Sequence, residues 1–245
     1  MQALIVGGTK GLGLELTRWA ASTDVTPIPT GRVMSLEMVS TMGHGIAFEQ
    51  MDVTSRQSIG TTMQLLRSVK WASDIRYLFY LPAIHLQGKF CEQDPEKVNE
   101  LFQTTVFGLM NVVRAFHTTQ TQPYHLVVVS STASYRILSD ETAYGTAKAA
   151  QAQFARDFHQ ELARDLPGSK TLIVHPGGMR TDFRKRTGVD TSKLLDPMVV
   201  ARFIWEEVAA QALDSSPGVS FMRELHILRG PDGQPIVERG IKAPQ

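Results

Sequence analysis

The side chains with the clearest chemical potential are Tyr144 and Lys148, four residues apart in T-A-Y-G-T-A-K. At the start of a helix this spacing places both on one face. A phenol with a pKa near 10 transfers protons poorly at neutral pH, and a nearby ammonium lowers that pKa by favouring the phenolate. The pair therefore suits acid–base chemistry at an oxygen atom, although taken alone the same spacing is more often a solvated helix face. Ser131, thirteen residues earlier, adds a hydroxyl that can hydrogen-bond such an oxygen.

A glycine-rich loop near the start of the chain offers a different kind of chemistry. Residues 6–13 read V-G-G-T-K-G-L-G, with glycines spaced as G-x-x-x-G-x-G at Gly7, Gly11 and Gly13. Such glycines allow a tight turn and a close approach of the backbone to a pyrophosphate at a helix N-terminus. A strand-to-helix turn without any ligand has the same composition, so the loop alone is a weak signal.

Alternating apolar runs and amphipathic stretches must position these groups. The expected strands cover 3–6, 25–30, 46–53, 75–81, 124–130, 171–175 and 224–228, and the expected helices begin near residue 12 and cover 55–69, 96–117, 142–165 and 198–209. Two prolines in the second strand predict that it is short or irregular. The alternation predicts a single α/β domain over 1–245, a Rossmann-type doubly wound parallel sheet of about seven strands flanked by helices. Ser131 then lies at the carboxyl edge of the sheet, where such folds bind ligands.

Composition excludes several classes of partner. The chain has 245 residues and a formal charge of +1, which gives no sign of nucleic-acid binding. No apolar run approaches the roughly 20 residues that span a bilayer, and no signal-peptide pattern precedes the first strand, so no membrane partner is expected. The single cysteine, Cys91, forms no internal disulfide and is compatible with a reducing cytoplasm. The seven histidines show no metal-ligand spacing, so no metal site is expected.

These motifs together resemble the classical short-chain dehydrogenase/reductase (SDR) superfamily, over roughly residues 2–230. The family's T-G-x-x-x-G-[IL]-G resembles residues 6–13, with Val6 in place of the threonine, and its serine and Y-x-x-x-K fall on the three side chains above. The resemblance implies the following cofactor-binding residues: Gly7, Thr9, Lys10, Gly11, Leu12, Gly13, Arg32, Asp52, Val53, Pro82, Ala83, Thr105, Tyr144, Lys148, Pro176, Gly177, Met179 and Thr181. It implies that Asp52 contacts adenine, that Thr181 holds the nicotinamide carboxamide, and that Met179 flanks the nicotinamide.

Two positions depart from the family pattern. The family's N-N-A-G is replaced by Y-L-P-A at 80–83, so the wall on the adenosine side differs. The family's catalytic asparagine, which holds a water linking the lysine to solvent, is replaced by Thr105, while Asn111 lies six residues later on another face. Either Thr105 holds a water itself or the proton relay is impaired.

Two cations predict the choice of cofactor. Arg32 follows the second strand, where an acidic residue selects NAD and an arginine accommodates the 2′-phosphate of NADP, and Glu37 is the first acid downstream. In the superfamily a lysine at the place of Lys10 often joins that arginine around the phosphate. The cofactor is therefore expected to be NADP(H), unless Lys10 and Arg32 are two unrelated surface cations.

The resemblance implies an NADPH-dependent carbonyl reductase or alcohol dehydrogenase, with Ser131, Tyr144 and Lys148 as the catalytic residues. The alternative is a dinucleotide-binding sensor or partner subunit with little or no turnover. Other chemistry on this fold, such as dehydration or imine reduction, also stays open.

The expected partner is a small carbonyl or alcohol substrate that lies against Ser131 and Tyr144. Its further walls are expected from His85 and Leu86 and from residues 182–196. The basic start of that segment is either a site for an anionic substrate or a solvated charge run on a lid: Arg184, Lys185 and Arg186. The family resemblance also implies a homodimer or homotetramer through the helices over 96–117 and 142–165, which carry Phe102, Phe107, Phe154 and Phe158.

Overall fold

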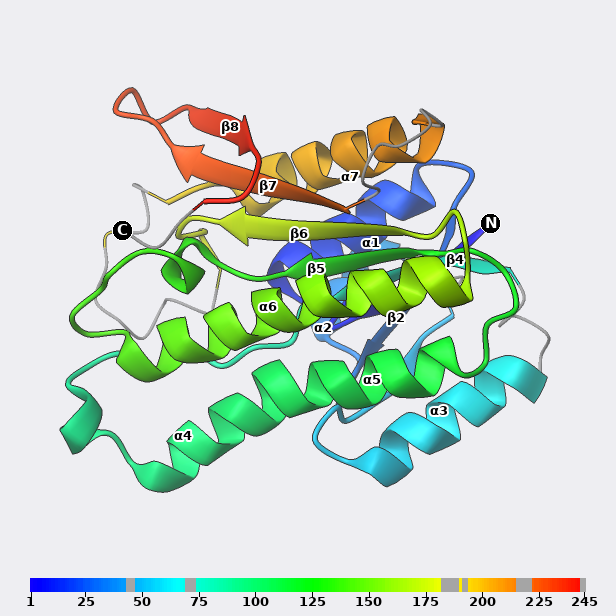
Figure 1. Cartoon of the computed structure of the whole chain (residues 1–245), viewed down its shortest axis with the longest axis horizontal. Coiled ribbons are helices and arrows are strands. Elements are labelled where there is room, and N and C mark those ends of the chain that lie inside the picture. Colours follow the sequence, from blue (N-terminus) through cyan, green and yellow to red (C-terminus); the bar gives the residue numbers. More distant parts are fainter. Residues whose placement is uncertain (43–46, 69–73, 182–189, 191–193, 215–221, 243–245) are drawn as a thin grey trace.

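The computed structural model describes residues 1–42, 47–68, 74–181, 190, 194–214 and 222–242. Within these residues, eight strands form one sheet in the order β3-β2-β1-β4-β5-β6-β7-β8 (Figure 1). β1 to β7 are parallel, and β8 pairs antiparallel with β7. The predicted single-domain, doubly wound α/β fold is confirmed. The strands are β1 Gln2–Val6, β2 Thr26–Gly31, β3 Glu49–Gln50, β4 Ile75–Tyr80, β5 His125–Val129, β6 Lys170–Pro176, β7 Met222–Arg229 and β8 Pro235–Arg239.

Helices cover both faces of the sheet, and successive strand residues supply the two cores (Figure 1). Leu4 and Leu78 pack with α3, α5 and α6, whereas Ile5 and Phe79 pack with α1 and α7. Because both faces are buried, the central strands must be apolar without alternation, which explains runs such as A-L-I-V. The α-helices are α1 Gly11–Ala21, α2 Leu36–Met42, α3 Arg56–Ser68, α4 Pro95–Phe102, α5 Gly108–His117, α6 Thr142–Asp165 and α7 Pro197–Leu213.

β2 is longer and more regular than its proline content predicts. All six of its residues are in strand conformation, and five of them pair with β1. Alternate residues of β2 direct their backbone groups to opposite sides, and Pro27 and Pro29 face the same side as Gly31, whose carbonyl faces β3. On that side β3 is short and pairs only with Thr30 and Gly31. The nitrogens of both prolines therefore face the open side of β2, where no ladder donor is needed.

The helix expected over 96–117 is interrupted. α4 and α5 are joined by the π-helical segment η3, Gln103–Phe107. At Gly108, which begins α5, an added Cβ would lie 2.5 Å from the Tyr80 hydroxyl oxygen. That hydroxyl donates to the Thr104 carbonyl at 2.5 Å and so ties β4 to η3. A π-helical turn has about one residue more than an α-helical turn, which hardly alters the apolar pattern. The periodicity of the sequence therefore does not reveal the interruption of the helix.

Two further elements were not predicted. α2 is a short helix of seven residues. β8 follows the P-D-G turn at 231–233, a turn signal that the sequence does contain. Among the described residues no helix is long and apolar enough to cross a membrane.

Candidate active site

The glycine loop joins β1 to α1 in a conformation that needs its glycines. Gly7 and Gly11 have φ angles of 82° and 51°, in the left-handed region. A Cβ on Gly13 would lie 2.0 Å from the Gly7 carbonyl oxygen, so the first turn of α1 packs directly on the loop backbone. No side chain of the N-cap residue, Lys10, caps the backbone N–H groups at the start of this 11-residue helix. This cradle fits the pyrophosphate of a dinucleotide.

One cavity of about 440 Å³ joins this loop to the expected catalytic side chains. Its walls come from the glycine loop, from the segments after β4 and β5, from the start of α6 and from the segment after β6. The structure thus brings most of the expected site residues to one place: Gly7, Lys10, Gly11, Leu12, Gly13, Pro82, Ala83, Ser131, Tyr144, Lys148, Pro176, Gly177, Met179 and Thr181.

Five expected cofactor residues do not line this cavity. The Thr9 carbonyl accepts a hydrogen bond from Ser35 at 2.5 Å, and Arg32 is exposed. Asp52 Oδ1 accepts from the backbone N–H of Thr54 at 2.9 Å. The remaining two are buried: Val53 and Thr105. The basic run Arg184, Lys185 and Arg186 lies outside the described residues.

The cavity also has lining residues that were not expected. Two of them are acidic: Glu15 on α1 and Glu37 on α2 line the same cavity as Lys10. Lys10 occupies the N-cap position of α1, and its side chain makes no capping hydrogen bond. The cavity wall therefore carries charges of both signs. The others are Leu81, Val129, Ser130, Gly178, Arg180 and Pro197.

Ser131 begins a tight turn just beyond β5, separated from Val129 by Ser130. It is the N-cap of the 3₁₀ helix η4, Thr132–Ser134, and its Oγ accepts from the backbone N–H of Ala133 at 3.1 Å. Ser134 Oγ closes the same turn by donating to the Ser131 carbonyl oxygen at 2.7 Å. The hydroxyl of Ser131 is thus held by its own turn at the edge of the cavity.

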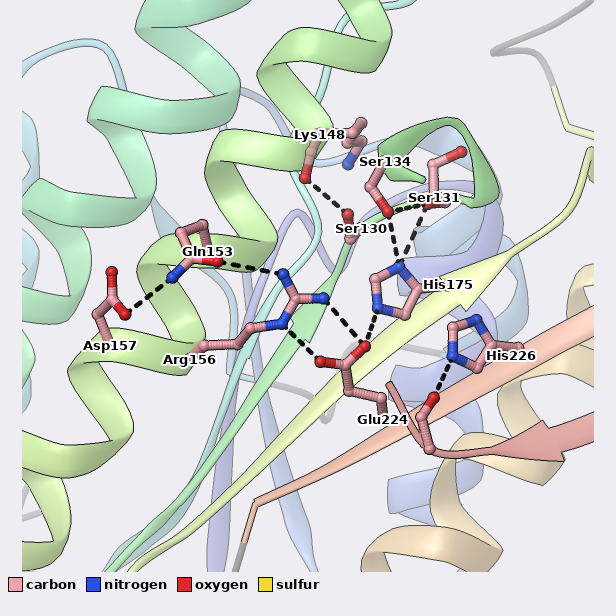
Figure 2. Close-up of polar contacts among 11 residues, drawn as sticks. Ser130, Ser131, Ser134, Lys148, Gln153, Arg156, Asp157, His175, Glu224 and His226 are labelled. Atoms are coloured by element: carbon pink, nitrogen blue, oxygen red, sulfur yellow. Dashed lines mark hydrogen bonds and ion pairs between the residues drawn. The ribbon is translucent and has the colours of Figure 1, made fainter. Parts of the chain in front are cut away.

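A chain of hydrogen-bonded polar side chains, buried at His175 and Glu224, supports this turn (Figure 2). His175 on β6 places Nδ1 2.9 Å from Ser134 Oγ and 3.3 Å from the Ser131 carbonyl oxygen. Its Nε2 lies 3.1 Å from Glu224 on β7, and Arg156 on α6 donates to both Glu224 oxygens, at 2.7 and 3.1 Å. Burial raises the pKa of Glu224, but hydrogen bonds from His175 and Arg156 outweigh it and lower that pKa to about 2. We call this chain, Ser134–His175–Glu224–Arg156, the serine support network.

His226 stacks on His175, with ring centroids 4.7 Å apart. Ligand atoms of His175, Glu224 and His226 lie within 4.8 Å of one another, a spacing that could hold a metal ion. However, Arg156 occupies both oxygens of Glu224, and His226 Nε2 lies 2.7 Å from the Gly240 carbonyl. A guanidinium at the carboxylate opposes cation binding, so the cluster fits a hydrogen-bonded network better than a metal centre.

Tyr144 and Lys148 lie in the first turns of α6, where both side chains are buried. The Lys148 Nζ is 6.0 Å from the Tyr144 ring centroid. It donates at 2.9 Å to the Val129 carbonyl and at 2.9 Å to Gln151 Oε1. Burial lowers the pKa of Lys148 to about 7. An ammonium that can lose its proton near neutral pH, beside a phenol, is suited to proton transfer.

The His85 ring lies beside Tyr144, but neither His85 nor Leu86, the expected substrate wall, lines the cavity. The His85 ring is 5.0 Å from the Tyr144 ring in an edge-on arrangement, and its Nε2 is 3.1 Å from Glu141. Leu86 packs against the apolar cluster that contains Tyr144.

Comparison with known proteins places the chain among dehydrogenases. The family described as short chain dehydrogenase matches residues 1–191. The benzil reductase ((S)-benzoin forming) of Saccharomyces cerevisiae is 24% identical, covering 88% of this chain and 92% of its own.

Two solved structures show the same fold. An alcohol dehydrogenase from the archaeon Thermococcus sibiricus, complexed with 5-hydroxy-NADP, gives a TM-score of 0.75 at 18% identity and covers 92% of this chain and 94% of that chain. A short-chain dehydrogenase/reductase from Burkholderia phymatum in complex with NAD gives 0.75 at 16% identity and covers 86% of each chain. The fold therefore accompanies either dinucleotide.

Proposed function

Because the chain belongs to the short-chain dehydrogenase family, we propose that it is an NADP(H)-dependent oxidoreductase acting on a small carbonyl or alcohol, with ketone reduction as the favoured direction. The observation that most supports this proposal is the shared cavity. Ser131, Tyr144 and Lys148 line the same space as the glycine loop, so a dinucleotide held by the loop would present its nicotinamide end to them.

Each side chain has a distinct role in this proposal. The bound nicotinamide supplies or accepts the hydride. Tyr144 gives its phenolic proton to the carbonyl oxygen as that oxygen gains negative charge, and Ser131 donates a hydrogen bond to the same oxygen. The Lys148 ammonium favours the phenolate form of Tyr144 and lowers the barrier to its proton transfer. The glycine loop would hold the pyrophosphate, and Thr181 the carboxamide.

The preference for NADP(H) over NAD(H) rests on Lys10. It is an exposed cation at the N-terminus of α1 and in the wall of the cavity, where a 2′-phosphate would find it. Arg32 follows β2 and is exposed; in this proposal it adds a second cation to the same phosphate. Glu37 opposes both, because a carboxylate in the cavity wall repels a phosphate and suits a ribose hydroxyl.

The test is NADPH oxidation by the purified chain with a panel of ketones, alongside NADPH binding followed by fluorescence titration. We expect turnover with at least one ketone, and loss of that turnover in Tyr144→Phe with binding retained. Binding without turnover on any ketone would favour the alternative of a dinucleotide-binding sensor or partner subunit. Absence of binding to either dinucleotide would contradict both.

The proposal includes a homodimer or homotetramer in a reducing cytoplasm. On the helices expected to pair, Phe107 is 47% exposed and Met110 is 36% exposed, whereas Phe154 and Phe158 pack partly against the core. The single cysteine is free and exposed, which suits a reducing compartment. A monomeric mass at micromolar concentration, measured by light scattering, would contradict the oligomer.

A further inference from the structure

The Lys148 ammonium is buried among neutral groups. β5 presents the Val129 carbonyl, and α6 presents Gln151 Oε1, each 2.9 Å from Nζ. Among the described residues, the titratable group facing Lys148 is Tyr144 on the same helix, and no charged side chain pairs with it. An ammonium has three donors, so two are used by these acceptors and one is left for the cavity that Lys148 lines.

The amide of Gln151 is oriented by what lies on its other side. Its side chain is fully buried, and its Nε2 donates to the Thr105 carbonyl in η3 at 3.3 Å. A carbonyl can only accept, so the nitrogen end of the amide must face Thr105 and the oxygen end must face Lys148. Besides Lys148, the buried positions of α6 within four residues of Gln151 are alanines, so a second polar side chain here calls for a specific reason: Ala147, Ala152 and Ala155.

We propose that Gln151 is a positioning residue of the active site. Its amide connects the Lys148 ammonium to the Thr105 carbonyl, stabilises the charged form of Lys148 and keeps that ammonium at the cavity wall. The catalytic consequence rests on the proposed function, but the connection itself exists in the protein without cofactor. An oxygen acceptor bonds an ammonium more strongly than a neutral amine. Removing Oε1 therefore destabilises the charged form of Lys148 while leaving the backbone of α6 intact.

The decisive experiment measures Lys148 directly in the cofactor-free protein. Lysine labelled with ¹³C and ¹⁵N is followed by NMR over a pH titration, with the Lys148 signal assigned from Lys148→Arg. In Gln151→Leu we expect the pKa of Lys148 to fall by about one to two pH units, the size of one hydrogen bond to a charged group. In Gln151→Glu it should stay at or above the unmodified value, because a carboxylate or a carboxylic acid still offers an oxygen to Nζ.

Two comparisons keep this test decisive. Gln160→Leu, at an exposed position of the same helix, is the matched control and should leave the titration unchanged. If Gln151→Leu does not fold, Gln151→Met removes the same acceptor. An unchanged pKa in the Leu or Met variant, or a fall in Gln151→Glu as large as in Gln151→Leu, would overturn the inference.

Kinetics then separate this inference from the proposed function. If the unmodified chain reduces ketones, the alkaline limb of its kcat/KM profile should move to lower pH in Gln151→Leu by the same amount as the NMR titration. A chain that binds NADPH but reduces no ketone contradicts the proposed activity, while the Lys148 titration still decides the role of Gln151.

Discussion

Two polar networks support the proposed catalytic side chains, and they stabilise a buried charge in opposite ways. Lys148 is a buried cation whose hydrogen-bond partners are neutral oxygens, those of Val129 and Gln151. Glu224 is a buried anion that contacts His175 on one oxygen and Arg156 on both. The first charge is solvated by dipoles alone, whereas the second is paired with a guanidinium.

The two pKa values follow from this difference. Without a counter-charge, burial lowers the pKa of Lys148 to about 7. For Glu224 burial acts in the raising direction, but hydrogen bonds from His175 and Arg156 prevail and bring the pKa to about 2. Lys148 can therefore change its charge near neutral pH, as proton chemistry requires, while Glu224 stays ionised and holds the Ser131 turn in place.

The largest effect is expected at Lys148, where we expect turnover to fall without a loss of stability. Lys148→Met should lower turnover by about 10²–10⁴-fold, the range for loss of acid–base assistance. The free energy of unfolding at pH 7 should not fall, because the variant no longer buries an unpaired cation. Kinetics and urea unfolding check both parts, with the exposed Lys97→Met as the control. A strong loss of stability would show that Lys148 is compensated after all.

In the serine support network we expect the main effect of a substitution to be on stability rather than on turnover. Arg156→Met leaves the Glu224 carboxylate buried without its guanidinium and should cost about 2–4 kcal/mol of unfolding free energy, less than a fully buried pair because the Arg156 side chain is 25% exposed. Arg164→Met, on the same helix, removes an exposed pair with Asp165 and should have a much smaller effect, because solvent screens that pair. Equal losses in the two variants, measured by urea unfolding, would contradict a structural role for Arg156.

The pH dependence of stability should differ between the two networks. The folded-state pKa of Glu224 lies below its unfolded value, so its contribution is present above about pH 4.3 and is lost as the pH falls toward about 2. The folded-state pKa of Lys148 is also lowered, but for a cation this makes stability rise between about pH 7 and 10.4. Unfolding of the unmodified chain, Glu224→Gln and Lys148→Met at several pH values measures both windows. A Glu224→Gln variant with the acid sensitivity of the unmodified chain would contradict the first.

From the sequence we could predict the features that depend on local residue patterns and on the order of the strands. The helix over 142–165 has the expected bounds, and Ser131 and the glycine loop both line one cavity at the carboxyl edge of the parallel sheet. The sequence could not predict the serine support network, because Arg156 and Glu224 are 68 residues apart and meet only through the way β7 pairs beside β6. Gln151 could not be predicted for a different reason. In a helical pattern a glutamine is typical of the surface, and the pattern does not reveal that the π-helical segment places a carbonyl beside it.

The smallest expected effect concerns Lys10, a cation that is exposed where Lys148 is buried. Solvent and salt screen it, so Lys10→Ala should weaken NADPH binding by on the order of tenfold, the low end for a hydrogen bond to a charged group, and should leave NADH binding nearly unchanged. Arg32→Ala should have a smaller effect in the same direction, because Arg32 does not line the cavity. Glu37→Ala should act in the opposite direction and tighten NADPH binding, because it removes a carboxylate from the cavity wall. Fluorescence titration of both dinucleotides at moderate salt measures all three. Equal affinity of the unmodified chain for NADPH and NADH would show that Glu37 offsets the two cations and would overturn the proposed preference.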